Sequence, residues 1–108
     1  MNIKELEQFI EEEIKKLVNY YKNKSDEELT LAMTAKMAEE MGELINEILS
    51  HKGFQRKEKL ENLKKEELGK EFADVLVTAL ILAKRFDIDI EAALKKRMNK
   101  LKERSYTE

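Results

Sequence analysis

Apolar residues recur at three- and four-residue steps along most of this chain, which is the spacing of amphipathic helices. A first helix is expected from residue 3 to about residue 23, and its apolar face contains Ile3, Leu6, Ile10, Ile14, Leu17 and Tyr21. After a polar break, Ser25 and Glu28 have the spacing of a capping box. This spacing predicts a second helix to about residue 50, with an apolar core stripe of Leu31, Met37, Met41, Leu44, Ile45 and Ile48.

Two further helices are expected in the second half of the chain. The third should begin between residues 62 and 65 and end near residue 86, and apolar residues between Phe72 and Ala83 cover most of its circumference. The last should follow Asp89, which is a good N-cap, and run to about residue 104. Because a helix that is apolar nearly all round must be buried on most sides, we expect a second copy of the chain to cover it. The pattern predicts an all-α antiparallel bundle of about four to five helices, completed by oligomerisation.

Composition narrows the class of protein. A chain of 108 residues is one domain by length, and the absence of cysteine excludes disulfides and thiolate chemistry. The net charge is -2 with acids and bases interspersed, which gives no overall signature of nucleic-acid binding. The longest apolar run, Val75 to Ala83, is too short to span a bilayer, and the N-terminus lacks the apolar core of a signal peptide. We expect no nucleic acid and no membrane as partners, and a cytoplasmic location.

Two pairs of acids interrupt helices that otherwise have the composition of a core. Glu40 and Glu43 are three residues apart, and so are Glu71 and Asp74, so each pair shares one helix face. Antiparallel packing of these helices would gather four carboxylates, which repel one another without a cation. Oxygen ligands favour Mg²⁺ first and Mn²⁺ second. The alternative interpretation, exposed acids on an amphipathic bundle, accounts less well for Asp74 within its apolar run.

Other kinds of site lack their residues. A di-iron carboxylate bundle requires a Glu-x-x-His on each of two helices, whereas His51 is the only histidine and follows Glu47 at a different spacing. The sequence contains no Gly-rich phosphate loop, and no Ser/His/Asp or Cys/His constellation can be assembled. A site for a divalent cation together with a phosphorylated ligand is therefore the interpretation that the acids favour.

The acidic pairs and two elements downstream of them resemble the MazG-like nucleotide pyrophosphohydrolases of the all-α NTP pyrophosphatase superfamily. The matching stretches are Glu39-Glu40-Met-Gly-Glu43-Leu, Glu71-Phe-Ala-Asp74-Val-Leu, Asp87-Ile-Asp-Ile-Glu-Ala-Ala-Leu, and Asn99-Lys100 with Arg104. They extend over roughly residues 31 to 106. The resemblance implies that residues 1–108 form a single domain of this kind.

The resemblance also implies roles for individual residues. It implies Mg²⁺ ligation by Glu40, Glu43, Glu71 and Asp74. Either Glu39 or Glu43 would position the attacking water. The residues expected to bind the substrate are Lys36, Asn99, Lys100 and Arg104.

The implied activity is Mg²⁺-dependent hydrolysis of a nucleoside triphosphate, NTP or dNTP, to the monophosphate and pyrophosphate. The expected role is housekeeping of the nucleotide pool, carried out by a homodimer or homotetramer. The alternative from another class is a non-catalytic module of the same fold that oligomerises or binds a nucleotide for regulation. The preferred base is not encoded in any pattern that the sequence shows.

Overall fold

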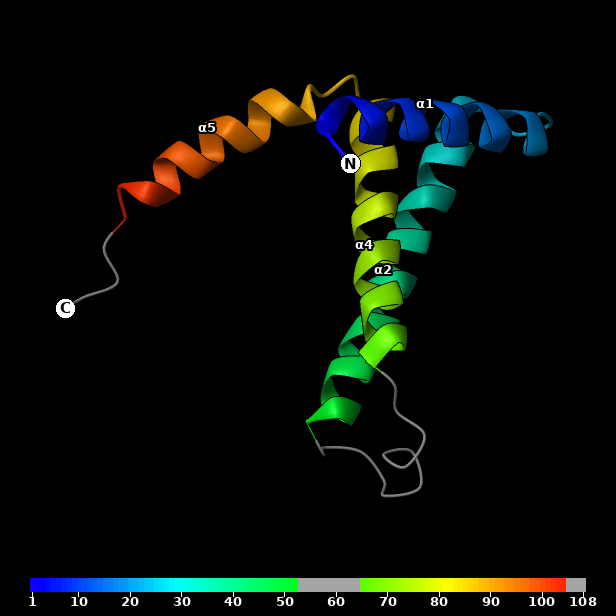
Figure 1. Cartoon of the computed structure of the whole chain (residues 1–108). Coiled ribbons are helices and arrows are strands. Elements are labelled where there is room, and N and C mark those ends of the chain that lie inside the picture. The colour runs from blue at the N-terminus through cyan, green and yellow to red at the C-terminus, as the bar shows by residue number, and fades with distance from the viewer. Residues whose placement is uncertain (53–64, 105–108) are drawn as a thin grey trace.

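The structure is a computed structural model that describes residues 1–52 and 65–104. In order, its helices are α1 (Ile3–Tyr20), α2 (Asp26–His51), α4 (Lys65–Arg85) and α5 (Ile90–Lys102), as Figure 1 shows. The described residues contain no strand, so the predicted all-α class is confirmed. The predicted start of the third helix before residue 65, most of the connector and the tail after residue 104 lie outside the described residues. None of the described helices is apolar over a length that would cross a membrane.

Local capping chemistry sets where three of the helices begin. The Asn2 side chain accepts a hydrogen bond from the Glu5 backbone N–H at 2.9 Å, and the Asp89 side chain accepts one from Ala92 at 3.1 Å. At α2 the predicted capping box is confirmed, because Ser25 and Glu28 each accept a hydrogen bond from the other's backbone N–H at 3.0 Å. The first helix ends at Tyr20, three residues before its predicted end at residue 23.

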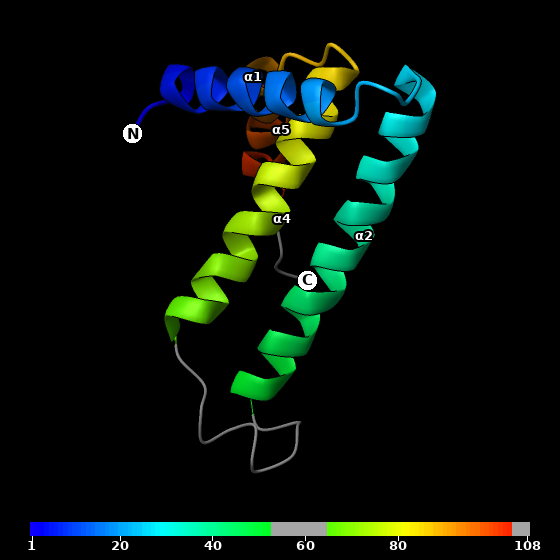
Figure 2. The same cartoon turned by 90° about the vertical axis from the view of Figure 1, so that its right-hand side faces the viewer.

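The helices α2 and α4 run antiparallel, side by side, and α1 crosses them near one end (Figures 1 and 2). The buried core lies where these three helices meet, and it contains Ile10, Leu29, Met33, Ile81 and Leu82. Near the same end, the Arg85 guanidinium donates to the Asp26 carboxylate at 2.6 Å and to the Thr30 hydroxyl at 3.3 Å. These bonds join the end of α4 to the start of α2. Together with the core, they fix the relative position of the two helices that carry the acids.

The predicted core stripe of α2 is only partly right for the single chain. Met37 packs against the core and Leu44 is half-buried, but Leu31 is 64% exposed, Met41 46% and Ile45 53%. The buried apolar residues of α2 are instead Leu29 and Met33. The reason is that the other described helices lie along one side of α2, and that side contains Glu40. A second apolar side of α2 therefore faces outward.

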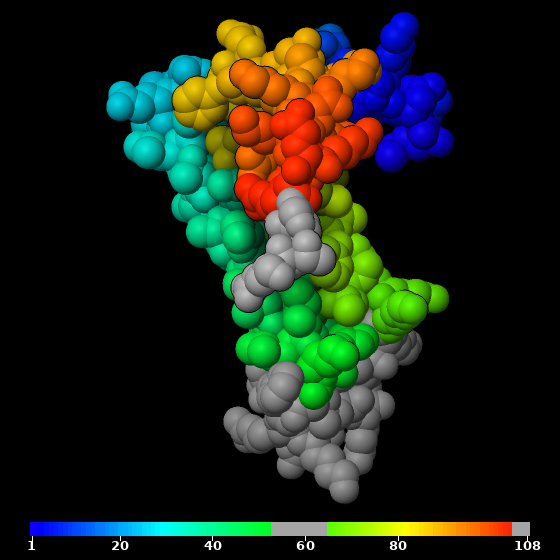
Figure 3. Space-filling view, turned by 90° about the vertical axis from the view of Figure 1, so that its left-hand side faces the viewer, coloured from blue at the N-terminus to red at the C-terminus, as the bar shows by residue number. Residues whose placement is uncertain are grey.

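The last helix, α5, projects away from the rest of the molecule (Figures 1 and 3). Ile90 at its start is half-buried, but every residue from 91 to 102 is exposed. The turn that leads into it includes Asp87, whose φ of 56° lies in the left-handed region that aspartate tolerates better than most residues. This turn directs α5 away from α2 and α4.

Candidate metal centre

Three carboxylates from two helices meet midway along the α2–α4 pair. One oxygen each of Glu40, Glu43 and Glu71 can be chosen so that all three lie within 4.8 Å of one another. Glu40 and Glu43 come from successive turns of α2, and Glu71 faces them from α4, as the antiparallel pairing predicts. The prediction that these two helices gather acids is therefore confirmed for three of the four ligand candidates.

The cluster contains acceptor atoms that nothing in the described chain satisfies. Glu40 is only 6% exposed, and its Oε1 lies 3.0 Å from the Lys36 ammonium. The other oxygen of Glu40 and the Oε2 of Glu71 are shielded from solvent and have no hydrogen-bond partner among the described residues. Buried polar atoms of this kind are rare in native proteins unless a water or ion satisfies them. An all-oxygen donor set with two such atoms fits a hard divalent cation.

The electrostatics of the cluster favour a positive charge. Burial raises the pKa of the Glu71 carboxyl, the nearby Lys70 opposes this, and the negative charges of Glu43, Asp74 and Glu40 raise the pKa further. The hydrogen bond to Glu40 raises the pKa of Lys36, with further contributions from the charges of Glu40, Glu39 and Glu43. A divalent cation among these oxygens would favour the ionised carboxylates and so reverse the effect on Glu71.

Asp74 lies one turn beyond Glu71 but outside the close group. Its Oδ2 is 3.7 Å from the Lys70 ammonium, and its side chain is 40% exposed. The sequence predicted that Asp74 lies in apolar surroundings, which exposed acids on a bundle account for less well than a metal site does. This prediction of its surroundings is wrong, because solvent and Lys70 both reach the carboxylate. The Asp74 backbone carbonyl accepts a hydrogen bond from the buried Thr78 hydroxyl at 2.7 Å, so that hydroxyl is satisfied within α4.

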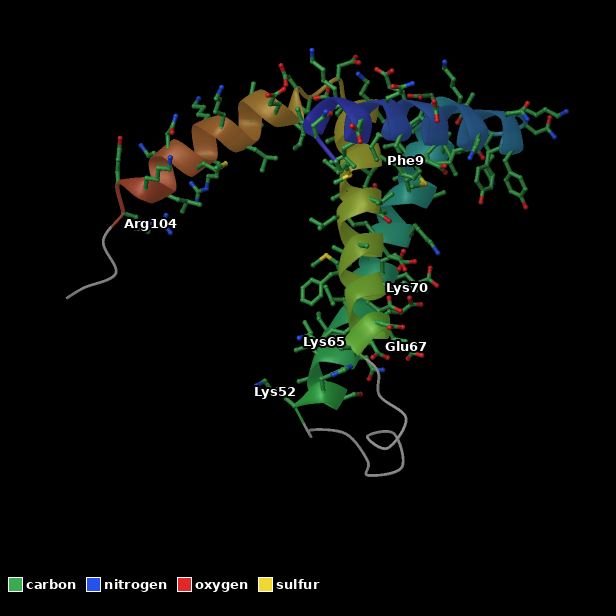
Figure 4. All side chains as sticks on the ribbon, viewed as in Figure 1. Phe9, Lys52, Lys65, Glu67, Lys70 and Arg104 are labelled. Atoms are coloured by element: carbon green, nitrogen blue, oxygen red, sulfur yellow. The ribbon has the colours of Figure 1, made fainter. Side chains whose placement is uncertain are left out.

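The remaining predicted residues divide between two places. Lys36 belongs to the cluster through Glu40, and Glu39 is exposed on the adjoining surface of α2. By contrast, Asn99, Lys100 and Arg104 are exposed on or just after α5 and are not brought to the carboxylates of their own chain. Figure 4 shows Arg104 at the far end of α5 and Lys70 beside α4, well apart.

Sequence reasoning missed a second polar pair on α2. The Nε2 of His51 and the Oε2 of Glu47 lie 3.9 Å apart. Both atoms are shielded from solvent, and neither has a hydrogen-bond partner within residues 1–52 and 65–104. Glu47 follows Glu43 by one helical turn, and this spacing was the available signal. Sequence reasoning also gave no role to Lys70, although its spacing of four residues from Asp74 is that of a helical ion pair.

One comparison with known proteins gave a match. A family model described as the MazG nucleotide pyrophosphohydrolase domain matches residues 28–107, which include all of the carboxylates of the cluster and the whole of α5. No match was found among curated proteins or among solved structures. The matched range begins near the start of α2, so α1 precedes it.

Proposed function

The chain belongs to the MazG nucleotide pyrophosphohydrolase family, and we propose that it hydrolyses nucleoside triphosphates, NTP or dNTP, to the monophosphate and pyrophosphate. The observation that carries the proposal is the group of three carboxylates from α2 and α4, with two unsatisfied buried oxygens, inside the matched region. The proposed biological role is housekeeping of the nucleotide pool in the cytoplasm.

The carboxylates fit a divalent cation, and we assign Mg²⁺ to Glu40, Glu43, Glu71 and Asp74, with Mn²⁺ as the second choice. When bound, the ion would neutralise phosphate charge and acidify a water molecule. The ion pair between Lys36 and the Oε1 of Glu40 holds the Glu40 carboxylate in place. Burial of Glu40 keeps competing water away from its other oxygen, Oε2. Asp74 would exchange its pairing with Lys70 for the ion, which leaves that ammonium free to meet a phosphate.

In the proposed reaction, water attacks the α-phosphorus, the bond from that phosphorus to the bridging oxygen breaks, and pyrophosphate leaves. The proton of the attacking water passes to a carboxylate. Glu43 is exposed and belongs to the close group, and Glu39 is exposed on the adjoining turn, so either can accept it. Lys36, Asn99, Lys100 and Arg104 are the proposed contacts to the phosphates and the nucleotide.

We also propose that the working form is a homodimer or homotetramer. Large apolar side chains remain exposed on both helices that carry the acids, among them Met41, Ile45, Phe72 and Leu76. Adjacent apolar side chains exposed on this scale are typical of surfaces that bind another chain. Light scattering tests this part of the proposal, and a monomer at micromolar concentration would contradict it.

The activity is tested by pyrophosphate release from a panel of ribo- and deoxyribonucleoside triphosphates, with Mg²⁺ or with EDTA. Release should require the metal and should fall by roughly 100-fold or more in Glu43→Gln. Glu66→Gln is the matched control, because Glu66 is exposed in the first turn of α4 and outside the cluster. Full release by Glu43→Gln would overturn the site. Stabilisation by Mg²⁺ without release from any nucleotide would favour the non-catalytic module instead.

A further inference from the structure

A cavity of about 370 Å³ lies where the start of α1, the end of α4 and the start of α5 meet (Figure 1). Its volume is near the lower end of the range for small-molecule sites, which is about 300–1,000 Å³. None of the carboxylates of the α2–α4 cluster lines it, and α1 precedes the range that the family model matches. The cavity is therefore a separate feature of this chain. Much of its lining is apolar: Ile3, Leu6, Ile10, Leu80, Ile88 and Ile90.

The rest of the lining carries a negative charge that the chain does not neutralise. The ammonium of Lys84, the basic residue of the lining, pairs at 3.3 Å with Glu11, which lies outside the cavity. Within residues 1–52 and 65–104, no ion pair or hydrogen bond engages the carboxylates of Glu7 and Asp87. The acids that line the cavity are Glu7, Asp87, Asp89 and Glu91.

The carboxylate of Asp87 is not required by the turn that contains it. The backbone N–H of Asp87 donates to the Lys84 carbonyl, and that of Ile88 donates to the Ala83 carbonyl, both at 3.0 Å, which is the pattern of a Schellman motif. Glycine or asparagine is usual at the left-handed position of this motif, where Asp87 has a φ of 56°. The negative charge of Asp87 also lies at the C-terminal end of α4, where the helix dipole favours a cation instead. Because asparagine would serve the turn at least as well, we infer that the carboxylate binds a ligand.

The positions of the acids decide which kind of cation the cavity accepts. A metal ion needs converging oxygens, but among the described residues only the α2–α4 cluster brings three within 4.8 Å of one another. The acids of the cavity are instead distributed over α1, the turn and the start of α5, around an apolar floor. This arrangement is complementary to a molecule whose ammonium groups are separated by methylene groups. The methylene groups cover the apolar floor, and each ammonium meets a carboxylate.

We propose that this cavity binds an aliphatic diamine or polyamine. One ammonium group meets Glu7 on α1, a second meets Asp87 in the turn, and the methylene chain lies on the apolar floor between them. The bound amine joins α1 to the turn that directs α5, so it stabilises that end of the molecule. The site is separate from the carboxylate cluster, and binding at it does not require nucleotide hydrolysis.

Calorimetric titration of the full chain with putrescine tests the site, in the presence of excess Mg²⁺. The test variant combines Glu7→Gln with Asp87→Asn, which removes both charges and preserves the size of the side chains. Wild type should bind putrescine, and the variant should bind it at least about 10-fold more weakly, because it loses two charge-assisted hydrogen bonds. Without putrescine, the melting temperature of the variant should be no lower than that of wild type, because asparagine suits the left-handed position and removes a charge from the end of α4.

The matched control is Glu12→Gln, because Glu12 is exposed on the same helix as Glu7 and does not line the cavity. It should bind putrescine as wild type does. Butylamine, which has a single ammonium group, should bind wild type at least about 5-fold more weakly than putrescine. Absence of putrescine binding by wild type, or equal binding by the Glu7/Asp87 variant, would overturn the site. Equal affinities for butylamine and putrescine would overturn the assignment of a diamine.

Titration of Glu43→Gln distinguishes the cavity from the carboxylate cluster, which could also attract an ammonium group. This variant should bind putrescine with the affinity of wild type, whether or not the chain releases pyrophosphate from any nucleotide. Loss of putrescine binding in Glu43→Gln, with binding retained in the Glu7/Asp87 variant, would place the amine at the cluster and overturn the proposal.

Discussion

The addition of Mg²⁺ to the metal-free protein is the most direct test of the carboxylate cluster. The three oxygens lie within 4.8 Å of one another, whereas two opposite ligands of Mg²⁺, each about 2.1 Å from the ion, are about 4.2 Å apart. Adjacent ligands are only about 3.0 Å apart, and at most one pair among three can be opposite, so the oxygens need to close by up to about 2 Å. The ion would also satisfy the buried oxygens of Glu40 and Glu71 that have no hydrogen-bond partner among the described residues. We expect Mg²⁺ to bind the folded chain and to stabilise it.

The size of this effect follows from mass action. At a Mg²⁺ concentration 100 times the dissociation constant, binding stabilises the folded state by about 2.7 kcal/mol. For a domain of about 100 residues this raises the melting temperature by about 10–20 °C. If Glu43→Gln removes one ligand and weakens binding about 100-fold, the stabilisation at the same concentration falls to about 0.4 kcal/mol, which corresponds to about 2–3 °C.

The assay is thermal unfolding followed by circular dichroism, in EDTA and across a Mg²⁺ titration, for wild type, Glu43→Gln and Glu66→Gln. The Glu66 variant should respond as wild type does, because that side chain lies outside the cluster. Equal responses of wild type and Glu43→Gln would refute the assignment, since any stabilisation would then come from general screening of the negative charge. No response of wild type would refute the metal site itself.

Three further predictions concern the folded chain. In EDTA, the raised pKa of Glu71 means that its contribution to stability is present below about pH 4.3 and is lost as the pH rises through the higher folded-state pKa. The melting temperature of wild type should therefore fall relative to that of Glu71→Gln as the pH is raised above about 4.5. Ile10→Ala should cost about 2–5 kcal/mol in urea unfolding, whereas Phe9→Ala, at a 44% exposed position on the same helix, should cost less; equal losses would contradict the position of α1 on the core. Ser25→Ala should cost about 1 kcal/mol, measured in the same way, because it removes the capping box of α2, and an unchanged midpoint would contradict that cap.

Helix starts could be predicted from the sequence because capping is local. Ser25 and Asp89 each satisfy a backbone N–H group three residues away, so the signal and its effect lie in one short stretch. The predicted end of α1 lies three residues beyond its actual end at Tyr20. Tyr21 continues the apolar period and packs against the core, but it lies just beyond the helix end. Periodicity alone does not distinguish an apolar residue inside a helix from one that directly follows it.

The face on which α2 packs could not be predicted in the same way. Its apolar residues occupy two sides of the helix, and only the positions of α1 and α4 decide that Leu29 and Met33 are buried while Met41 and Ile45 are exposed. The surroundings of Asp74 depended on the same unknown, because its exposure and its pairing with Lys70 follow from how α4 is turned. The i, i+3 spacing of the acids was sufficient to place Glu40 and Glu43 on one face, since that relation is internal to a single helix.

The carboxylate cluster draws on a single pair of helices, and this bears on how a metal would bind. Its carboxylates come from α2 and α4 of one chain, whose relative position is fixed by the core and by the Arg85–Asp26 ion pair. We therefore expect the affinity for Mg²⁺ to be a property of each chain alone, whether or not a second copy is bound.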